Sequence, residues 1–171
     1  MIEALLEAWS LKALPRAGWI RMGIAAPESV AAHSWGIATL VLQLLPAELD
    51  LGRALTYAAL HDLPEVRTGD ITPADGVAVV DKHRAEDDAM AALCADLPRG
   101  DELLATWRRY EAQSDDESRF VRQLDRLDMA LQALVYERRT GTDLGEFYAS
   151  AARVIEHPAL REVFDALLAA R

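Results

Sequence analysis

The sequence has one cysteine, no long apolar run and no signal-peptide pattern in its first residues, and each of these shortages argues against a class of protein. Cys94 cannot form an internal disulfide, and a lone thiol suits a reducing compartment. The longest apolar stretch, around "TLVLQLLP", is shorter than the roughly 20 residues that span a bilayer. The N-terminus lacks the basic start and apolar core of a signal peptide. We therefore expect a cytoplasmic protein with no membrane partner.

Positive charge and strand-forming residues are also scarce. The chain has 18 Lys and Arg against 28 Asp and Glu, a net charge of -10, which repels a nucleic-acid backbone. Ala and Leu dominate while Val, Ile and aromatic residues are few, a composition that favours helices. No repeat or linker divides the chain. We expect no nucleic-acid partner and a single all-α domain over residues 1–171.

Apolar periodicity and helix-breaking residues predict a series of helices. Ser29 is the expected N-cap of the second helix and Gly141 the expected stop of the longest. Long irregular loops in a helical domain tend to carry function, so loops 16–27 and 63–76 draw attention. The predicted helices cover about 2–14, 30–45, 50–62, 77–95, 101–112, 116–139 and 143–155, with a last one after Pro158.

A dense run of ionisable residues, "HDLPEVRTGD", follows the helix predicted over 50–62. Neighbours on a helix point about 100° apart. His61 and Asp62 can still converge on one ion near a helix end, which Pro64 supplies. Imidazole and carboxylate ligands suit a borderline-to-hard divalent ion such as Mn, Fe, Co, Ni or Mg. They do not indicate a thiolate zinc site. Two ligands rarely suffice, so others must come from elsewhere in the chain.

Candidates for the remaining ligands lie on two other predicted helices. His33 lies among small residues, where another backbone can approach closely. Asp125 and Asp128 both lie near an apolar stripe, and periodicity alone does not choose between them. A carboxylate in apolar surroundings needs a partner or a metal.

Each candidate also has a purely structural reading. His33 could be a hydrogen-bonded core histidine, and Asp125 could pair with an arginine such as Arg122 or Arg126. Glu65 could solvate a helix end, and Asp70 could cap the Thr68-Gly69 turn. The functional interpretation rests on the joint arrangement.

That arrangement resembles a known family. A histidine on one helix, a His-Asp pair on the next and an aspartate on a later helix is similar to the ligand order of HD-domain metal-dependent phosphohydrolases. The resemblance is to the 5′-deoxynucleotidase branch, the HD-domain-containing protein 2 group, from about residue 12 to 140. The segments that carry it are "GWIRMGIAAPESVAAHSWGIA", "HDLPEVRTGDITPADG", "DKHRAEDDAM" and "RFVRQLDRLDMALQALVYE".

The resemblance implies a helical bundle with one divalent ion held between central helices. The context "RQLD" selects Asp125 over Asp128 as the last ligand. Mn, Co, Fe, Ni, Mg and Zn are all candidate ions, and relatives commonly form homodimers. The implied ligands are His33, His61, Asp62 and Asp125.

The activity implied is hydrolysis of the 5′-phosphate of a deoxynucleoside monophosphate by metal-activated water. Glu65 matches a glutamate that positions the nucleophile or handles a proton, provided the helix persists through Pro64 so that it faces the site. Asp70 matches an acid near the sugar hydroxyl or leaving group. It is therefore either a sugar contact or the proton donor.

Positive charge for the phosphate comes from the loop before the His33 helix. Arg16 and Arg21 flank Trp19 there. In the family the Trp19 position is linked to preference for 2′-deoxyribose, so the indole is expected to form a wall against the sugar. Core packing beneath the loop is the alternative.

The chain departs from the family pattern at two positions. Ala32 stands where relatives have an acid before the first ligand, and Gly18 where some bacterial nucleotidases have an arginine. The basic patch Lys82, His83 and Arg84 could contact phosphate, another subunit or only solvent. Two further acids, Glu86 and Glu111, are expected to pair with arginines.

Other activities fit the same residues. A phosphodiesterase or a nucleoside-triphosphate hydrolase is the nearest alternative within the fold. A non-enzymatic nucleotide sensor or metal-binding interaction protein is the alternative from another class. All implied ligands and Glu65 are present, which favours an enzyme.

Overall fold

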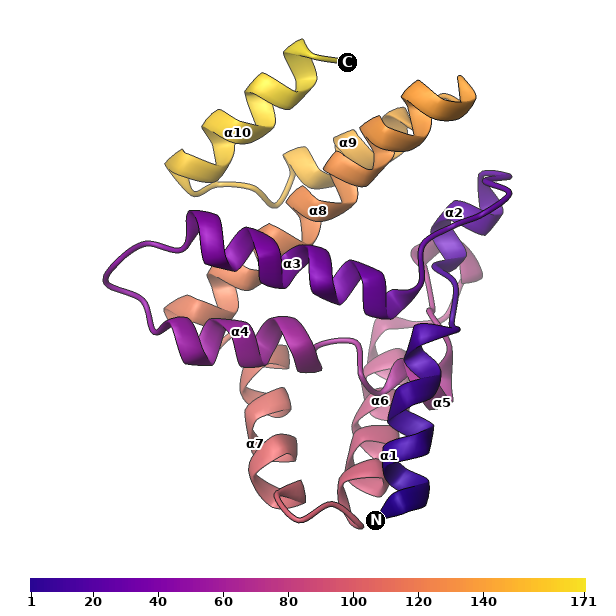
Figure 1. Ribbon diagram of the computed structural model, residues 1–171, viewed down its shortest axis with the longest axis vertical. Helices are drawn as coiled ribbons and strands as arrows, with labels where there is room; N and C mark the ends of the chain where they lie inside the picture. Colours follow the sequence, from indigo (N-terminus) through magenta and orange to yellow (C-terminus); the bar gives the residue numbers. More distant parts are fainter.

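Helices and short connections make up the computed structural model, which describes residues 1–171 (Figure 1). The only β-type pairing is an isolated antiparallel bridge between Pro15 and Ser29. The all-α prediction is confirmed. The helices are α1 (Ile2–Trp9), α2 (Ala17–Arg21), α3 (Val30–Leu44), α4 (Leu51–Leu60), α5 (Glu65–Thr68), α6 (Val79–Cys94), α7 (Gly100–Glu111), α8 (Asp116–Thr140), α9 (Gly145–Ala152) and α10 (Pro158–Ala169), with 3-10 turns at Ser10–Lys12 and Pro73–Asp75.

Three helices form the centre of the molecule. α3 and α4 lie side by side and both pack on the long helix α8 (Figure 1). α9 and α10 cover the C-terminal half of α8, while α6 and α7 pair at the opposite end, close to α1 (Figure 1). The side chains that meet at the centre are apolar and fully buried: Ile37, Val41, Ala54, Tyr57, Leu124 and Leu127.

Local signals in the sequence set several helix ends correctly. The Ser29 hydroxyl accepts a hydrogen bond from the Ala32 backbone N–H at 3.1 Å, which caps α3. Gly141 follows α8 with a φ of 74°, a left-handed conformation that glycine adopts without strain. None of the helices combines the length and apolar character that a membrane span requires.

The two predicted loops contain short helices that the pattern did not reveal. α2 lies within 16–27, and α5 lies within 63–76. The predicted helix over 50–62 ends at Leu60, so Glu65 does not continue it across Pro64 but begins α5. Helices of five or four residues are too short for a periodic pattern, and tertiary contacts hold them in place.

Gly141→Ala is expected to destabilise the protein by about 1–2 kcal/mol, because a Cβ disfavours the left-handed backbone that ends α8. The control is Gly52→Ala, an exposed position with helical backbone in α4, where the gain in helix propensity of up to about 1 kcal/mol is partly offset because the Cβ would lie 3.3 Å from the Asp50 cap oxygen. Urea denaturation of the two variants measures both changes. Equal stability of the two would contradict the role given to Gly141.

Candidate metal centre

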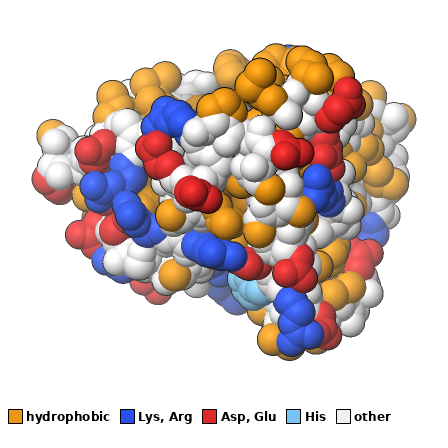
Figure 2. All heavy atoms as spheres, turned by 90° about the horizontal axis from the view of Figure 1, so that it is seen from below, with side chains coloured by type: hydrophobic (Ala, Val, Ile, Leu, Met, Phe, Trp, Pro, Cys, Tyr) orange, Lys and Arg blue, Asp and Glu red, His pale blue; other side chains and the backbone are white.

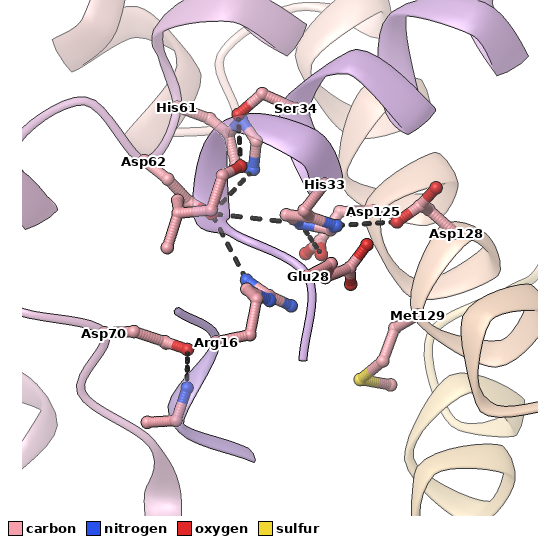
Figure 3. Close-up of polar contacts among 12 residues, drawn as sticks. Arg16, Glu28, His33, Ser34, His61, Asp62, Asp70, Asp125, Asp128 and Met129 are labelled. Atoms are coloured by element: carbon pink, nitrogen blue, oxygen red, sulfur yellow. Dashed lines mark hydrogen bonds and ion pairs between the residues drawn. The ribbon is translucent and has the colours of Figure 1, made fainter. Parts of the chain in front are cut away.

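Two histidines and an aspartate converge where α3, α4 and α8 meet. His33 comes from the first turn of α3, His61 caps the C-terminal end of α4, and Asp125 lies in the middle of α8. One ligand atom from each lies within 4.8 Å of the others (Figure 3). Both histidines are buried, with exposed fractions of 0% and 5%. Three of the ligands expected from the sequence therefore lie around one point.

Asp62, the fourth expected ligand, lies at the edge of this trio. Its Oδ2 is 3.1 Å from His61 Nε2 and 3.8 Å from His33 Nε2. The same oxygen accepts a hydrogen bond from the Arg16 guanidinium at 3.4 Å (Figure 3). The four side chains together offer a nitrogen and oxygen donor set.

Both imidazole rings are oriented by a partner on their outer nitrogen. His33 Nδ1 lies 2.7 Å from the Asp128 carboxylate, and His61 Nδ1 lies 3.1 Å from the Ala58 carbonyl. These partners only accept, so each Nδ1 carries the proton. Both Nε2 atoms are buried and have no hydrogen-bond partner. Two orphaned imidazole nitrogens facing two carboxylates fit a divalent ion with borderline or hard preference.

The electrostatics of the site keep its carboxylates ionised. Burial alone would raise the pKa of Asp62, but His61, His33 and Arg16 outweigh it and hold that pKa well below its ordinary value. Burial would also raise the pKa of Asp125, but Arg126 and His33 outweigh burial, and that pKa is strongly lowered. For His33, burial and Arg16 lower the pKa, yet Asp125 and Asp128 raise it to about 9. The carboxylates thus attract positive charge into the site.

The structure gives Asp125 and Asp128 different places. Asp125 Oδ1 lies 3.2 Å from His33 Nε2, whereas Asp128 contacts Nδ1 on the other side of the same ring. Asp128 fits there because α3 has a glycine at position 36, where a Cβ would overlap the Asp128 carboxylate. Sequence reasoning missed the roles of Asp128 and Gly36, although the small residues around His33 pointed to a close approach of backbones.

A cavity of about 840 Å³ opens beside the trio. Its lining includes all of the catalytic and substrate-binding residues expected from the sequence, together with Asp62 and Asp125. Two further arginines of its wall, Arg126 and Arg153, were not predicted from the sequence. Cations on its wall are suitable partners for an anionic ligand on a protein of negative net charge.

The two arginines expected to bind phosphate differ in how exposed their side chains are. Arg16 is largely buried and contacts Asp62, whose charge helps to raise the pKa of the guanidinium although burial opposes the shift. Arg21 is 41% exposed and pairs with Glu146 at 2.8 Å. Arg16 is therefore the cation fixed next to the expected ligand Asp62, and Arg21 lies farther out on the wall.

Glu65 lies at the start of α5 and is 3% exposed. Its Oε2 has no hydrogen-bond partner. Burial, together with the nearby charges of Asp62 and Asp70, raises the pKa of Glu65 to about 10. A carboxyl group that keeps its proton at neutral pH, on the wall of a cavity, is suited to proton transfer.

Asp70 is fixed by a contact that the sequence did not indicate. Its Oδ2 accepts a hydrogen bond from the Ala17 backbone N–H at 2.7 Å, 53 residues away in the chain (Figure 3). That N–H belongs to the first residue of α2, so Asp70 caps this short helix. The side chain also lines the cavity.

Trp19 is packed into the core. The indole is 1% exposed, and its ring centroid lies 4.3 Å from that of Phe147 and 5.2 Å from that of Tyr136. Its Nε1–H donates to a Glu28 carboxylate oxygen at 3.0 Å. Of the two expectations for Trp19, core packing describes the structure better, because the ring is almost wholly buried, although the residue is also part of the cavity lining.

The basic patch of α6 is engaged in local ion pairs. Lys82 lines the cavity, donates to the Ile71 carbonyl at 3.0 Å and lies 3.5 Å from Glu86. His83 lies 3.1 Å from Glu111. The expectation that Glu86 and Glu111 pair with arginines was wrong, because their partners are a lysine and a histidine of α6. On the face drawn in Figure 2, acidic and basic side chains are interspersed and form no continuous basic surface.

Comparison with known proteins identifies relatives over nearly the whole chain. The family model for the HD domain matches residues 8–163. A Bos taurus protein named 5′-deoxynucleotidase HDDC2 is 38% identical, over 100% of this chain and 85% of its own length. The Homo sapiens protein of the same name is 36% identical, over 100% of this chain and 86% of its own length.

Solved structures share the fold. The PH0347 protein of Pyrococcus horikoshii superposes with a TM-score of 0.82 at 33% identity, covering 98% of both chains. A predicted metal-dependent phosphohydrolase of Magnetospirillum magnetotacticum superposes with a TM-score of 0.75 at 25% identity, covering 98% of this chain and 88% of its own.

Asp70→Ala is expected to lower the free energy of unfolding by about 1 kcal/mol, because the first N–H of α2 loses its acceptor. Asp70→Asn keeps an acceptor oxygen and should lose less. Urea denaturation measures both, with Asp96→Ala as an exposed control. Equal losses for Ala and Asn, or none for either, would contradict a capping role.

Proposed function

The chain belongs to the HD domain family, and on that premise we propose that it is a metal-dependent 5′-deoxynucleotidase. It would hydrolyse the 5′-phosphate of a deoxynucleoside monophosphate to deoxynucleoside and phosphate. The observation that carries the proposal is the pair of orphaned imidazole nitrogens facing carboxylates at the wall of a cavity that also holds Arg16. The names of the relatives support the substrate class.

The proposed ligands of one divalent ion are His33 Nε2, His61 Nε2 and an oxygen each from Asp62 and Asp125. When bound, such an ion lowers the pKa of a coordinated water to about 7 in the zinc case and neutralises charge on a phosphoryl oxygen. Mn, Co, Fe, Ni, Mg and Zn remain candidates, because the donor set accepts several of them.

Arg16 is the proposed phosphate ligand. Its guanidinium is held by Asp62 at 3.4 Å, so it is oriented before substrate enters. A planar guanidinium can bind two phosphate oxygens at once. Arg21 adds charge at the outer wall, where its pair with Glu146 leaves it partly exposed. Together they direct the phosphate towards the buried ligands.

Glu65 is the proposed proton-handling group. Its partner-free Oε2 is buried, and burial with two neighbouring acids favours the protonated form. It can therefore hold a proton for the leaving 5′-oxygen or exchange one with the attacking water. Asp70, fixed by the Ala17 N–H, is proposed to contact the sugar hydroxyl or leaving group.

Three broader features belong to the same proposal. One domain over all 171 residues is supported by a hydrophobic cluster with members from Trp19 to Leu167. A homodimer is supported by the exposed apolar side chains Trp35 and Leu42 on α3. A cytoplasmic location is supported by the free, buried thiol of Cys94.

Purified protein is expected to release phosphate from deoxynucleoside monophosphates when Mn or Co is supplied. A panel of mono-, di- and triphosphates and a phosphodiester, each tested with several divalent ions, measures this. Release from monophosphates alone supports the proposal. Activity only on triphosphates or phosphodiesters would support the other HD-type activities, and binding without turnover would support a nucleotide sensor.

Glu65→Gln is expected to lower kcat by about 10²–10⁴-fold, because the amide cannot transfer a proton. Metal affinity should stay unchanged, since Glu65 is not among the proposed ligands. Steady-state kinetics and calorimetric titration with Mn²⁺ separate the two quantities. Glu162→Gln on the exposed face of α10 is the control. Unchanged kcat in the Glu65 variant would remove Glu65 from the mechanism.

A further inference from the structure

His33 is held from behind by Asp128. The ring is 0% exposed, and its Nδ1 lies 2.7 Å from the Asp128 carboxylate (Figure 3). Because the ring is fully buried, this carboxylate is the group that orients it through Nδ1. Asp128 lies three residues after Asp125, so α8 presents one acid to each nitrogen of the same imidazole.

Glu28 is a second carboxylate within reach of the same ring. One of its oxygens lies within 4.8 Å of His33 and Asp128 ligand atoms, so a change of its rotamer could bring it to the imidazole (Figure 3). Its position is fixed twice. The Glu28 backbone N–H donates to the Tyr136 hydroxyl at 2.7 Å, and its side chain accepts from Trp19 Nε1 at 3.0 Å.

Trp19 therefore has a polar task inside the core. The ring is packed against Phe147 and Tyr136, and its one N–H donates a hydrogen bond to the Glu28 carboxylate. Without that hydrogen bond the Glu28 carboxylate is free to turn towards His33 and displace Asp128 from Nδ1. The indole thus acts on the metal centre at a distance, through Glu28.

We propose that Asp128, Glu28 and Trp19 form a buried support that positions His33 as a metal ligand, and that Trp19 is a positioning residue of the metal centre. The inference rests on the proposed function, because it takes His33 as a ligand. It assigns Trp19 a task other than the sugar wall expected from the sequence. Gly36 contributes to the same support, since it leaves room for the Asp128 carboxylate.

The support predicts graded losses of metal affinity. Asp128→Ala should weaken Mn²⁺ binding by about 10- to 100-fold, the usual effect of removing the partner of a ligand histidine. Asp128→Asn keeps an acceptor for Nδ1–H and should lose less. Trp19→Phe keeps an aromatic ring but removes the N–H together with the five-membered ring of the indole, and should weaken binding by about 2- to 10-fold, the effect of one hydrogen bond.

Calorimetric titration of Mn²⁺ into metal-free protein tests these values without relying on turnover. Asp88→Ala, an exposed acid on α6, is the matched control and should bind as the unaltered chain does. Thermal unfolding of each variant identifies any that fail to fold, and Asp128→Asn and Trp19→Phe keep the test decisive if Asp128→Ala is one of them. The ratio of kcat/KM for deoxyribose and ribose monophosphates is measured in parallel.

The outcomes separate this inference from the proposed function. If the unaltered chain binds no Mn²⁺, the proposed metal centre itself is wrong and the support falls with it. If it binds Mn²⁺ and the Asp128 and Trp19 variants bind as tightly, only the support is wrong. If Trp19→Phe changes the deoxyribose preference and leaves metal affinity intact, Trp19 acts on the sugar and its place in the support is refuted.

Discussion

The burial of charge where α3, α4 and α8 meet is the constraint on which the rest of the structure depends. Carboxylates and imidazoles placed among apolar helices are unfavourable unless each has a partner. The chain meets this demand by clustering them, so that His33 lies between Asp125 and Asp128, and Asp62 between His61 and Arg16. The positions of the central helices follow from that clustering.

The close approach of α3 to α8 is the packing feature that makes the cluster possible. Gly36 lies three residues after His33, on the side of α3 that meets Asp128. A larger residue there would separate the helices and remove Asp128 from Nδ1. The apolar core around Ile37 and Leu124 then stabilises the arrangement that the glycine permits.

The sequence predicted those features that local pattern encodes. Helix periodicity, the Ser29 cap and the Gly141 stop are local, and the structure confirms them. The order His33, His61-Asp62, Asp125 named the residues that the fold brings together, with Asp62 at the edge of the cluster. Periodicity left Asp125 and Asp128 ambiguous because residues three apart share a helix face; the family context chose Asp125, and in the structure the two acids lie at opposite nitrogens of the His33 ring. The short helix α2 and the burial of Trp19 depend on contacts with distant residues, which no local pattern contains.

The hydrogen bond from Ala17 to Asp70 has a consequence for how the site can change. It ties the segment that carries Arg16 to the segment that follows α5, the short helix that begins with Glu65, although the two lie about fifty residues apart in the chain. Neither segment can be exchanged without disturbing the other. A designer who transplants this pocket into a related helical scaffold has to move both segments together, including Asp70, whose hydrogen bond links them.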